Sequence, residues 1–252
     1  MLYLGDTSLT TAACYLAGVM HHAGFSFTYR PSSHVLRADD LQAAGKLLIL
    51  SDYPASRVSP ALMQQIVEQH QYGMNLLMIG GWESFQGLDG KWQGTPVGDL
   101  LPVIMQPTDD RMNVDGPAFV RCHGNHAITR DLPWDSRPPL IGGFNRVTAK
   151  QDAHTLLSVD LNTACRTPTG MELQLQSTHP LLVVREQGPG RIACLMTDLA
   201  PHWVGPLVDW GPGRVASQAP EAEAIEVGDC YARFIGQLIN WLREEFLQFR
   251  AP

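Results

Sequence analysis

The chain has 252 residues, a formal net charge of −7, and a composition of 44% hydrophobic and 17% charged residues. These values describe a folded globular protein, and the length suits a single α/β domain spanning residues 1–252. The negative charge and the absence of any basic run argue against nucleic-acid binding, because phosphate neutralisation needs clustered Lys and Arg.

The sequence also gives no reason to expect a membrane or an oxidising compartment. No apolar segment approaches the roughly 20 residues that a bilayer-spanning helix needs. Residues 1–6 indicate a strand rather than a signal peptide. Five scattered cysteines are typical of reduced thiols, so we expect a cytoplasmic protein.

The first half of the chain alternates apolar runs with helical patterns, which predicts right-handed crossovers and a parallel sheet. Ser59 and Pro60 form a helix start, with Ser59 as the cap and Pro60 in the first turn. The expected strands are 2–4, 25–29, 46–50 and 75–79, and the expected helices are 11–20, 38–43 and 60–72.

The second half has weaker periodicity. A long loop with a short helix at 97–103 occupies residues 87–115, and a second surface loop occupies 204–229. The turn at 187–190 predicts a hairpin over 181–196. Further strands are expected at 114–121 and 155–159, and a final helix at 230–246. The predicted fold is a three-layer α/β/α sandwich, flavodoxin-like, with a mainly parallel central sheet and a β-hairpin excursion.

Polar side chains follow three of the expected strands. The strand 75–79 ends at Gly80-Gly81 and is followed by Trp82-Glu83-Ser84, while Asp52-Tyr53 and Thr197–Trp203 follow two others. Open α/β sheets present their ligand sites at the carboxyl ends of the strands, so these residues are candidates for one site.

The order of elements and several short sequence segments resemble the class I glutamine amidotransferase-like fold, and within it a branch of glutamine amidotransferase-like proteins. The order of elements is also similar to that of ThuA-like proteins. The segments that carry the resemblance are Gly80–Phe85, Asp99–Val103, His126–Thr129, and Pro180–Arg185 through Thr197–Trp203. The resemblance covers nearly the whole chain.

The resemblance implies a nucleophilic cysteine at the turn 80–84, but Trp82 stands there. It implies oxyanion glycines at Asp52-Tyr53-Pro54, where the pair is missing. It also places the catalytic histidine at His202, without the glutamate that should follow. Since indole is not a nucleophile, we expect no glutamine hydrolysis by the usual thiol route. Cys122, beside a histidine, is a weak alternative nucleophile.

Each candidate also has a structural interpretation. Ser84 lacks the spacing of an elbow serine and is better interpreted as a helix cap. Glu83 is either a base or a ligand-binding carboxylate. Asp198 and His202 suggest an orienting pair for proton transfer, whereas His202 could instead anchor the 204–229 loop.

Aromatic residues offer a stacking surface for a sugar-like ligand, or else a satellite core. Trp82, Tyr53 and Trp203 are the ligand-binding candidates among them. The strand-end carboxylates and His202 lack metal-ligand spacing, so we predict no metal and no cofactor.

Two hypotheses follow. The first is a glutamine amidotransferase-like protein without the cysteine, which binds or acts on a small polar ligand through Asp52, Trp82, Glu83, Asp198 and His202. The second is a non-catalytic structural or interaction protein that self-associates through its long loops, so a homo-oligomer is expected.

Overall fold

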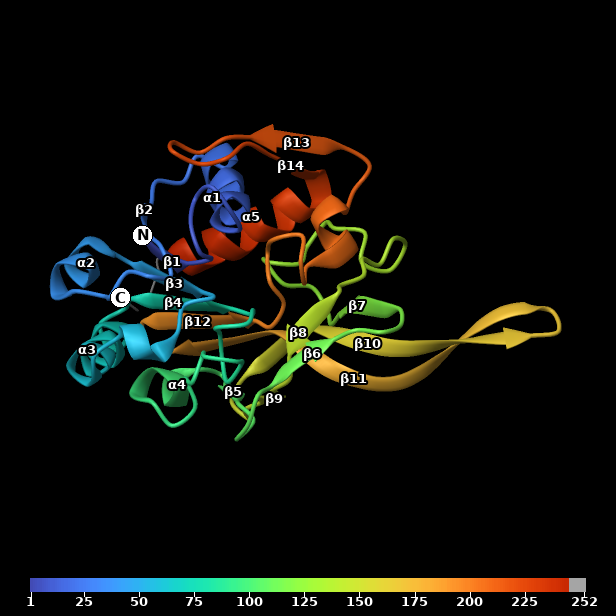
Figure 1. The fold of residues 1–252 in the computed structure, drawn as a ribbon, viewed down its shortest axis with the longest axis horizontal. Helices are drawn as coiled ribbons and strands as arrows, with labels where there is room; N and C mark the ends of the chain where they lie inside the picture. The colour runs from blue at the N-terminus through green and yellow to red at the C-terminus, as the bar shows by residue number, and fades with distance from the viewer. Residues whose placement is uncertain (245–252) are drawn as a thin grey trace, which may run out of the picture.

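An eight-stranded sheet organises the molecule, and the computed structural model describes residues 1–244. The strand order is β2-β1-β3-β4-β12-β11-β10-β7 (Figure 1). The strands are β1 (Leu2–Gly5), β2 (Thr28–Arg30), β3 (Leu47–Ser51), β4 (Asn75–Ile79), β7 (Ala118–Cys122), β10 (His154–Thr167), β11 (Gly170–Gln187) and β12 (Gly190–Leu195). The pairs from β2 to β12 are parallel, and those from β12 to β7 are antiparallel.

Helices cover both faces of the parallel half, as the sequence predicts (Figure 1). One face carries α1 (Ala13–His22) and α5 (Asp229–Arg243), and the other carries α3 (Pro60–Gln71) and α4 (Pro96–Leu100). A short helix α2 (Ala38–Ala43) lies near α3. All residues of β3 and β4 are buried, which explains their uninterrupted apolar sequences. The three-layer prediction is therefore confirmed.

Local signals set several of the boundaries. The Ser59 hydroxyl accepts a hydrogen bond from the Leu62 N–H at 3.3 Å, and Pro60 opens α3. Thr95 caps α4 in the same way, through the Gly98 N–H at 3.0 Å. Capping by a side-chain oxygen satisfies a backbone donor that the first helical turn leaves without a partner.

The predicted hairpin β11–β12 forms, but a much longer hairpin, β10–β11, was not expected. Strand β7 pairs only with residues 157–161 of β10, and β12 pairs only with residues 182–187 of β11. Residues 162–177, which we call the arm, therefore extend as a two-stranded ribbon beyond the sheet (Figure 1).

Two other predictions were wrong. Residues 204–229 are not an unstructured loop, because they contain the 3-10 helix η2 (Gly205–Asp209) and the ribbon β13 (Arg214–Ser217)–β14 (Ile225–Gly228). No helix follows Ser84, since the described chain continues there as turns up to α4. Both errors come from segments whose short elements have no periodicity of their own.

The remaining elements are short. Two small ribbons pair β5 (Val103–Ile104) with β9 (Thr148–Ala149), and β6 (Arg111–Asn113) with β8 (Gly143–Asn145). A 3-10 turn, η1 (Ala55–Arg57), follows β3. Among residues 1–244, no helix combines the length and apolar character needed to cross a membrane.

Candidate functional site

The turn after β4 requires glycine at positions 80 and 81, because neighbouring atoms occupy the space that a side chain would need there. A Cβ on Gly80 would lie 2.1 Å from the Met196 carbonyl oxygen, and one on Gly81 would lie 2.1 Å from Oδ1 of Asp52. The glycine pair therefore lets the end of β12 and the carboxylate after β3 approach the turn from two sides. It is this approach that assembles a site at the carboxyl ends of the strands.

Asp52 is held against the turn by three contacts. Its Oδ1 accepts a hydrogen bond from the Glu83 N–H at 2.7 Å, and its own N–H donates to the Ser84 hydroxyl at 3.0 Å. The Ser32 hydroxyl donates to its carbonyl oxygen at 2.7 Å. Its Oδ2 has no hydrogen-bond partner within residues 1–244.

Asp6, at the end of β1, lies beside Asp52 and is 3% exposed. Its Oδ2 accepts a 2.5 Å hydrogen bond from the Tyr3 hydroxyl, while Oδ1 is buried without a partner. Asp6, Thr7 and Asp52 all adopt left-handed backbone conformations, with φ of 51°, 64° and 43°. Such conformations cost free energy outside glycine, and they concentrate at functional sites.

Asp198, at the end of β12, completes a group of three carboxyl groups. It is 6% exposed, and its Oδ1 accepts hydrogen bonds from the N–H groups of Leu199 at 2.5 Å and Ala200 at 3.1 Å. The turn that holds Asp198 is itself fixed by the Tyr231 hydroxyl, which donates to the Leu199 carbonyl at 2.7 Å.

Burial and mutual repulsion alter the acidity of this group. Burial, with the charge of Asp6 second, raises the pKa of Asp52 to about 7. Burial raises the pKa of Asp6, and it raises the pKa of Asp198 well above its ordinary value, with the charges of Asp6 and Asp52 adding to the effect. Neighbouring carboxylates in a poorly solvated site cannot all ionise, so this group retains protons near neutral pH.

An exposed aromatic surface lies next to the acidic group. Trp82 is 41% exposed, the Arg111 guanidinium lies 4.8 Å from its ring centre, and the His202 ring lies 5.5 Å away, edge-on. His202 is exposed and has no hydrogen bond to Asp198 within residues 1–244, so the suggested Asp–His pair does not form here. His202 instead belongs with Trp82.

Beneath the turn, two buried polar residues hold it in place. The Asn145 side chain accepts from the Gly81 N–H at 2.9 Å and donates to the Gly81 carbonyl at 3.1 Å. It also donates to Asp110 at 2.8 Å, and Asp110 accepts from the Gln86 N–H at 2.9 Å. Burial raises the pKa of Asp110 to about 6.

This network occupies two backbone donors of the turn. The Gly81 and Glu83 N–H groups both donate to side-chain oxygens of the protein. An oxyanion hole needs free donors aimed at a developing charge. The turn thus has no nucleophile at Trp82, and the N–H groups of Gly81 and Glu83 are not free to bind an oxyanion.

Four of the five cysteines have thiols made less acidic by their surroundings. All five are free thiols, with Cys14 and Cys194 buried and the other three partly buried. Burial is the main cause that raises the pKa of Cys194, Cys14, Cys122 and Cys230. A raised pKa keeps a thiol protonated, whereas a nucleophilic cysteine needs a lowered one.

The remaining predicted site residues differ in how far their side chains are buried. Ser84 is 1% exposed, and its hydroxyl accepts the bond from Asp52 rather than capping a helix. Glu83 is partly exposed beside Trp82. Tyr53 and Trp203 are buried, donating to the His34 carbonyl at 2.6 Å and to Asn113 at 2.8 Å. Their part in ligand binding remains a prediction.

Sequence reasoning considered Asp6 only as one of several strand-end groups that could bind a metal, and it left Arg111 and Asn145 out altogether. The position of Asp6 directly after an expected strand was a usable signal. Arg111 and Asn145 come from β6 and β8, a ribbon inside segments without periodicity, and only the folded structure brings them to the turn.

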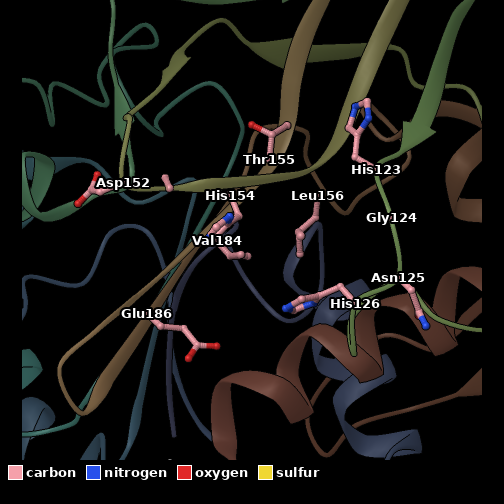
Figure 2. A pocket seen from close by; sticks show the side chains of 11 residues that line it. His123, Gly124, Asn125, His126, Asp152, His154, Thr155, Leu156, Val184 and Glu186 are labelled. Atoms are coloured by element: carbon pink, nitrogen blue, oxygen red, sulfur yellow. The ribbon is translucent and has the colours of Figure 1, made fainter.

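A separate cavity of about 640 Å³ lies on another part of the sheet than the turn after β4 (Figure 2). It opens beyond the end of β7, and its lining includes His123, His126, His154, Asp152 and Glu186. These residues come from the loop after β7 and from the ends of β10 and β11 next to it. None of the predicted site residues lines this cavity. Within residues 1–244, no group of three or more His, Cys, Asp or Glu side chains is arranged to hold a metal ion.

Comparison with known proteins gives a family and a fold. The family model described as "Putative glutamine amidotransferase" matches residues 31–213. The structures of two cytoplasmic proteins of Salmonella typhimurium, STM3548 and STM1381, are each 20% identical to the chain. STM3548 superposes with a TM-score of 0.73, over 96% of this chain and 98% of its own chain. STM1381 superposes with a TM-score of 0.72, over 96% of this chain and 99% of its own chain. The mmIFT52 N-terminal domain shares the fold at 12% identity and a TM-score of 0.52, over 96% and 97% of the two chains. No curated protein matches the sequence significantly.

Proposed function

The chain belongs to the family described as putative glutamine amidotransferases, and we propose that it works without that family's thiol chemistry. In this proposal the protein binds a small polar ligand at the carboxyl ends of the strands, or acts on one by acid–base chemistry. The site comprises Asp52, Asp198, Glu83, Trp82 and His202, with Asp6 added from its position beside Asp52.

One observation carries the proposal: three buried carboxyl groups at separate strand ends interact electrostatically, next to a turn with an exposed tryptophan. A buried acidic group of this kind destabilises the fold, and a role in binding or chemistry would explain why it is present. With a pKa of about 7, Asp52 can accept or donate a proton near neutral pH. Its unbonded Oδ2 is the atom that would do so.

The surroundings suggest the chemical class of the ligand. Carboxyl groups bind hydroxyl and amino groups, and the exposed face of Trp82 suits the apolar face of a sugar-like ring. Arg111 and His202, both next to the Trp82 ring, add donors for a phosphate or carboxylate substituent. We therefore favour a small polyhydroxylated or amino-bearing ligand, in a cytoplasmic protein.

A thermal-shift screen against amino acids, sugars and nucleotides tests the proposal, with wild type compared to Asp52→Asn and His202→Ala. A ligand of this site should raise the melting temperature of wild type and much less that of either variant. Asp115→Asn, at an exposed position outside the proposed site, is the matched control and should keep the shift. A ligand whose shift survives both site substitutions binds elsewhere, and the proposal then fails.

Glutamine hydrolysis is tested separately by ammonia release. We expect none above a buffer control, because the turn presents Trp82 where a thiol is needed. Ammonia release that iodoacetamide abolishes would show that one of the five cysteines acts as the nucleophile after all.

The second candidate is a non-catalytic protein that self-associates. It is supported by the arm, whose exposed apolar side chains have no function in a monomer. The two candidates are compatible, because the arm and the strand-end site use different residues.

A further inference from the structure

The arm carries a stripe of exposed apolar side chains on one of its faces. Met171, Leu173 and Leu175 are 65%, 51% and 59% exposed, and they alternate with Glu172, Gln174 and Gln176. Because alternate residues of a strand point to the same face, the three apolar side chains form one row. A row of this kind on a solvated ribbon normally marks an interface.

The arm also has unpaired edges. Within residues 1–244, the ladder between β11 and β12 covers only residues 182–187 of β11, so its part in the arm has no neighbour on that side. An isolated two-stranded ribbon is marginally stable in water, and an open strand edge readily pairs with another strand. A further strand could pair with the open edge and place its own side chains beside the apolar row.

We propose that a second copy of this chain supplies that strand. The β11 edges of two copies would pair antiparallel around a two-fold axis through Leu173, extending both arms into one four-stranded ribbon. This inference deepens the self-association candidate above and is independent of the ligand site.

The sequence of the stripe is self-complementary in this register. Antiparallel pairing centred on Leu173 places Met171 opposite Leu175 of the second copy, and Leu173 opposite its own equivalent. The apolar rows then join into one continuous row on a single face. A two-fold interface requires this kind of self-complementarity. Pairing displaced by one residue would place apolar side chains opposite polar ones.

The charges favour a second copy as the occupant. The pairing sets Glu172 opposite Gln174 of the second copy, so no like charges meet. The arm itself contains one Arg166 and one Glu172, and it is neutral in a chain whose net charge is −7. Two copies can therefore meet at their arms without the repulsion that acts between their bodies.

The buried area sets the expected strength. Edge pairing brings the two apolar rows into lateral contact but leaves their outer faces in solvent, because the side chains of a strand stand perpendicular to the sheet. The interface therefore buries less than the roughly 1,200 Å² of stable dimers. We expect a reversible dimer, with a dissociation constant in the micromolar range.

Sedimentation velocity over a wide range of protein concentrations tests the association. Wild type should pass from monomer to dimer as its concentration rises. The variant with Met171, Leu173 and Leu175 all replaced by threonine should remain a monomer, because threonine keeps strand propensity but removes most of the apolar area. The double variant Gln174→Thr, Gln176→Thr changes the opposite face and should dimerise like wild type.

Far-UV circular dichroism and the melting temperature show whether the body of each variant remains folded. A wild-type chain that stays monomeric up to about 500 μM overturns the proposal, since a micromolar dimer would be fully formed there. Dimerisation of the folded triple variant would equally overturn it.

Cysteine crosslinking tests the register. In the Cys165→Ser background, Leu173→Cys should form an intermolecular disulfide on mild oxidation, because its Cα lies about 5 Å from its equivalent across the axis. Leu175→Cys is the matched control, since two equivalents there are about 13 Å apart, beyond disulfide reach. Equal crosslinking of the two variants, or preferential crosslinking of Leu175→Cys, would refute the two-fold pairing at Leu173.

Discussion

Replacing Asp52 by asparagine should stabilise the protein at alkaline pH. Asparagine has the shape of the protonated carboxyl group and keeps an oxygen to accept the bond from the Glu83 N–H. It cannot ionise, so it avoids the cost of burying a negative charge and of placing that charge beside Asp6. The substitution therefore removes an unfavourable charge while leaving the contact geometry in place.

The magnitude follows from the pKa of Asp52, which rises from 3.8 in the unfolded chain to about 7 in the folded protein. Between these values the folded state binds more protons than the unfolded state, so the free energy of unfolding falls as pH rises. A difference of about 3 pKa units corresponds to at most ~4 kcal/mol. Asp52 retains some solvent contact, so we expect ~2 kcal/mol.

Urea unfolding of wild type and Asp52→Asn between pH 4 and pH 8.5 measures this difference. The two proteins should be equally stable near pH 4, and the variant should gain ~2 kcal/mol by pH 8, which is roughly 4–8 °C in melting temperature. Asp115→Asn should show no such trend. A variant that is no more stable than wild type at pH 8, or a gain that is the same at all pH values, would refute the reasoning.

Substitutions at three further positions test the packing and capping arguments by urea unfolding. Gly80→Ala should cost ~2 kcal/mol or more, because its Cβ would lie 2.1 Å from the Met196 carbonyl oxygen; unchanged stability would show that β12 can move away. Gly236→Ala, in α5 with open space around the new Cβ, should stabilise by ~0.5–1 kcal/mol, and a loss would contradict the open space. Ser59→Ala should cost ~1 kcal/mol because α3 loses its cap, whereas Ser59→Gly should cost less; equal losses would argue against the capping bond.

The parallel half of the fold could be predicted because each of its elements carries its own signal. Strands β3 and β4 are short apolar runs, and Ser59-Pro60 marks the start of α3 within one residue. These patterns reflect burial on both faces and backbone capping, which act over a few residues. No long-range information is needed to recognise them.

The arm could not be predicted in the same way. Its strands continue well past the buried segments 155–159 and 181–185, into residues that are polar, exposed or interrupted by register shifts. What holds them as strands is the pairing of β10 with β11, a contact between segments that local sequence does not reveal.

The candidate site likewise has one part that the sequence could predict and one part that it could not. The sequence by itself determined that Gly80-Gly81, Asp52 and Asp198 follow strand ends and that no cysteine occupies the turn, because position along a buried strand is a local property. Only the tertiary structure decided that Asp6 joins the acidic group, that Asn145 and Arg111 reach the turn, and that Asp198 bonds within its own turn instead of to His202. Those outcomes depend on which strands are neighbours and on how deeply each carboxyl group is buried, and both are properties of the packed sheet rather than of any stretch of chain.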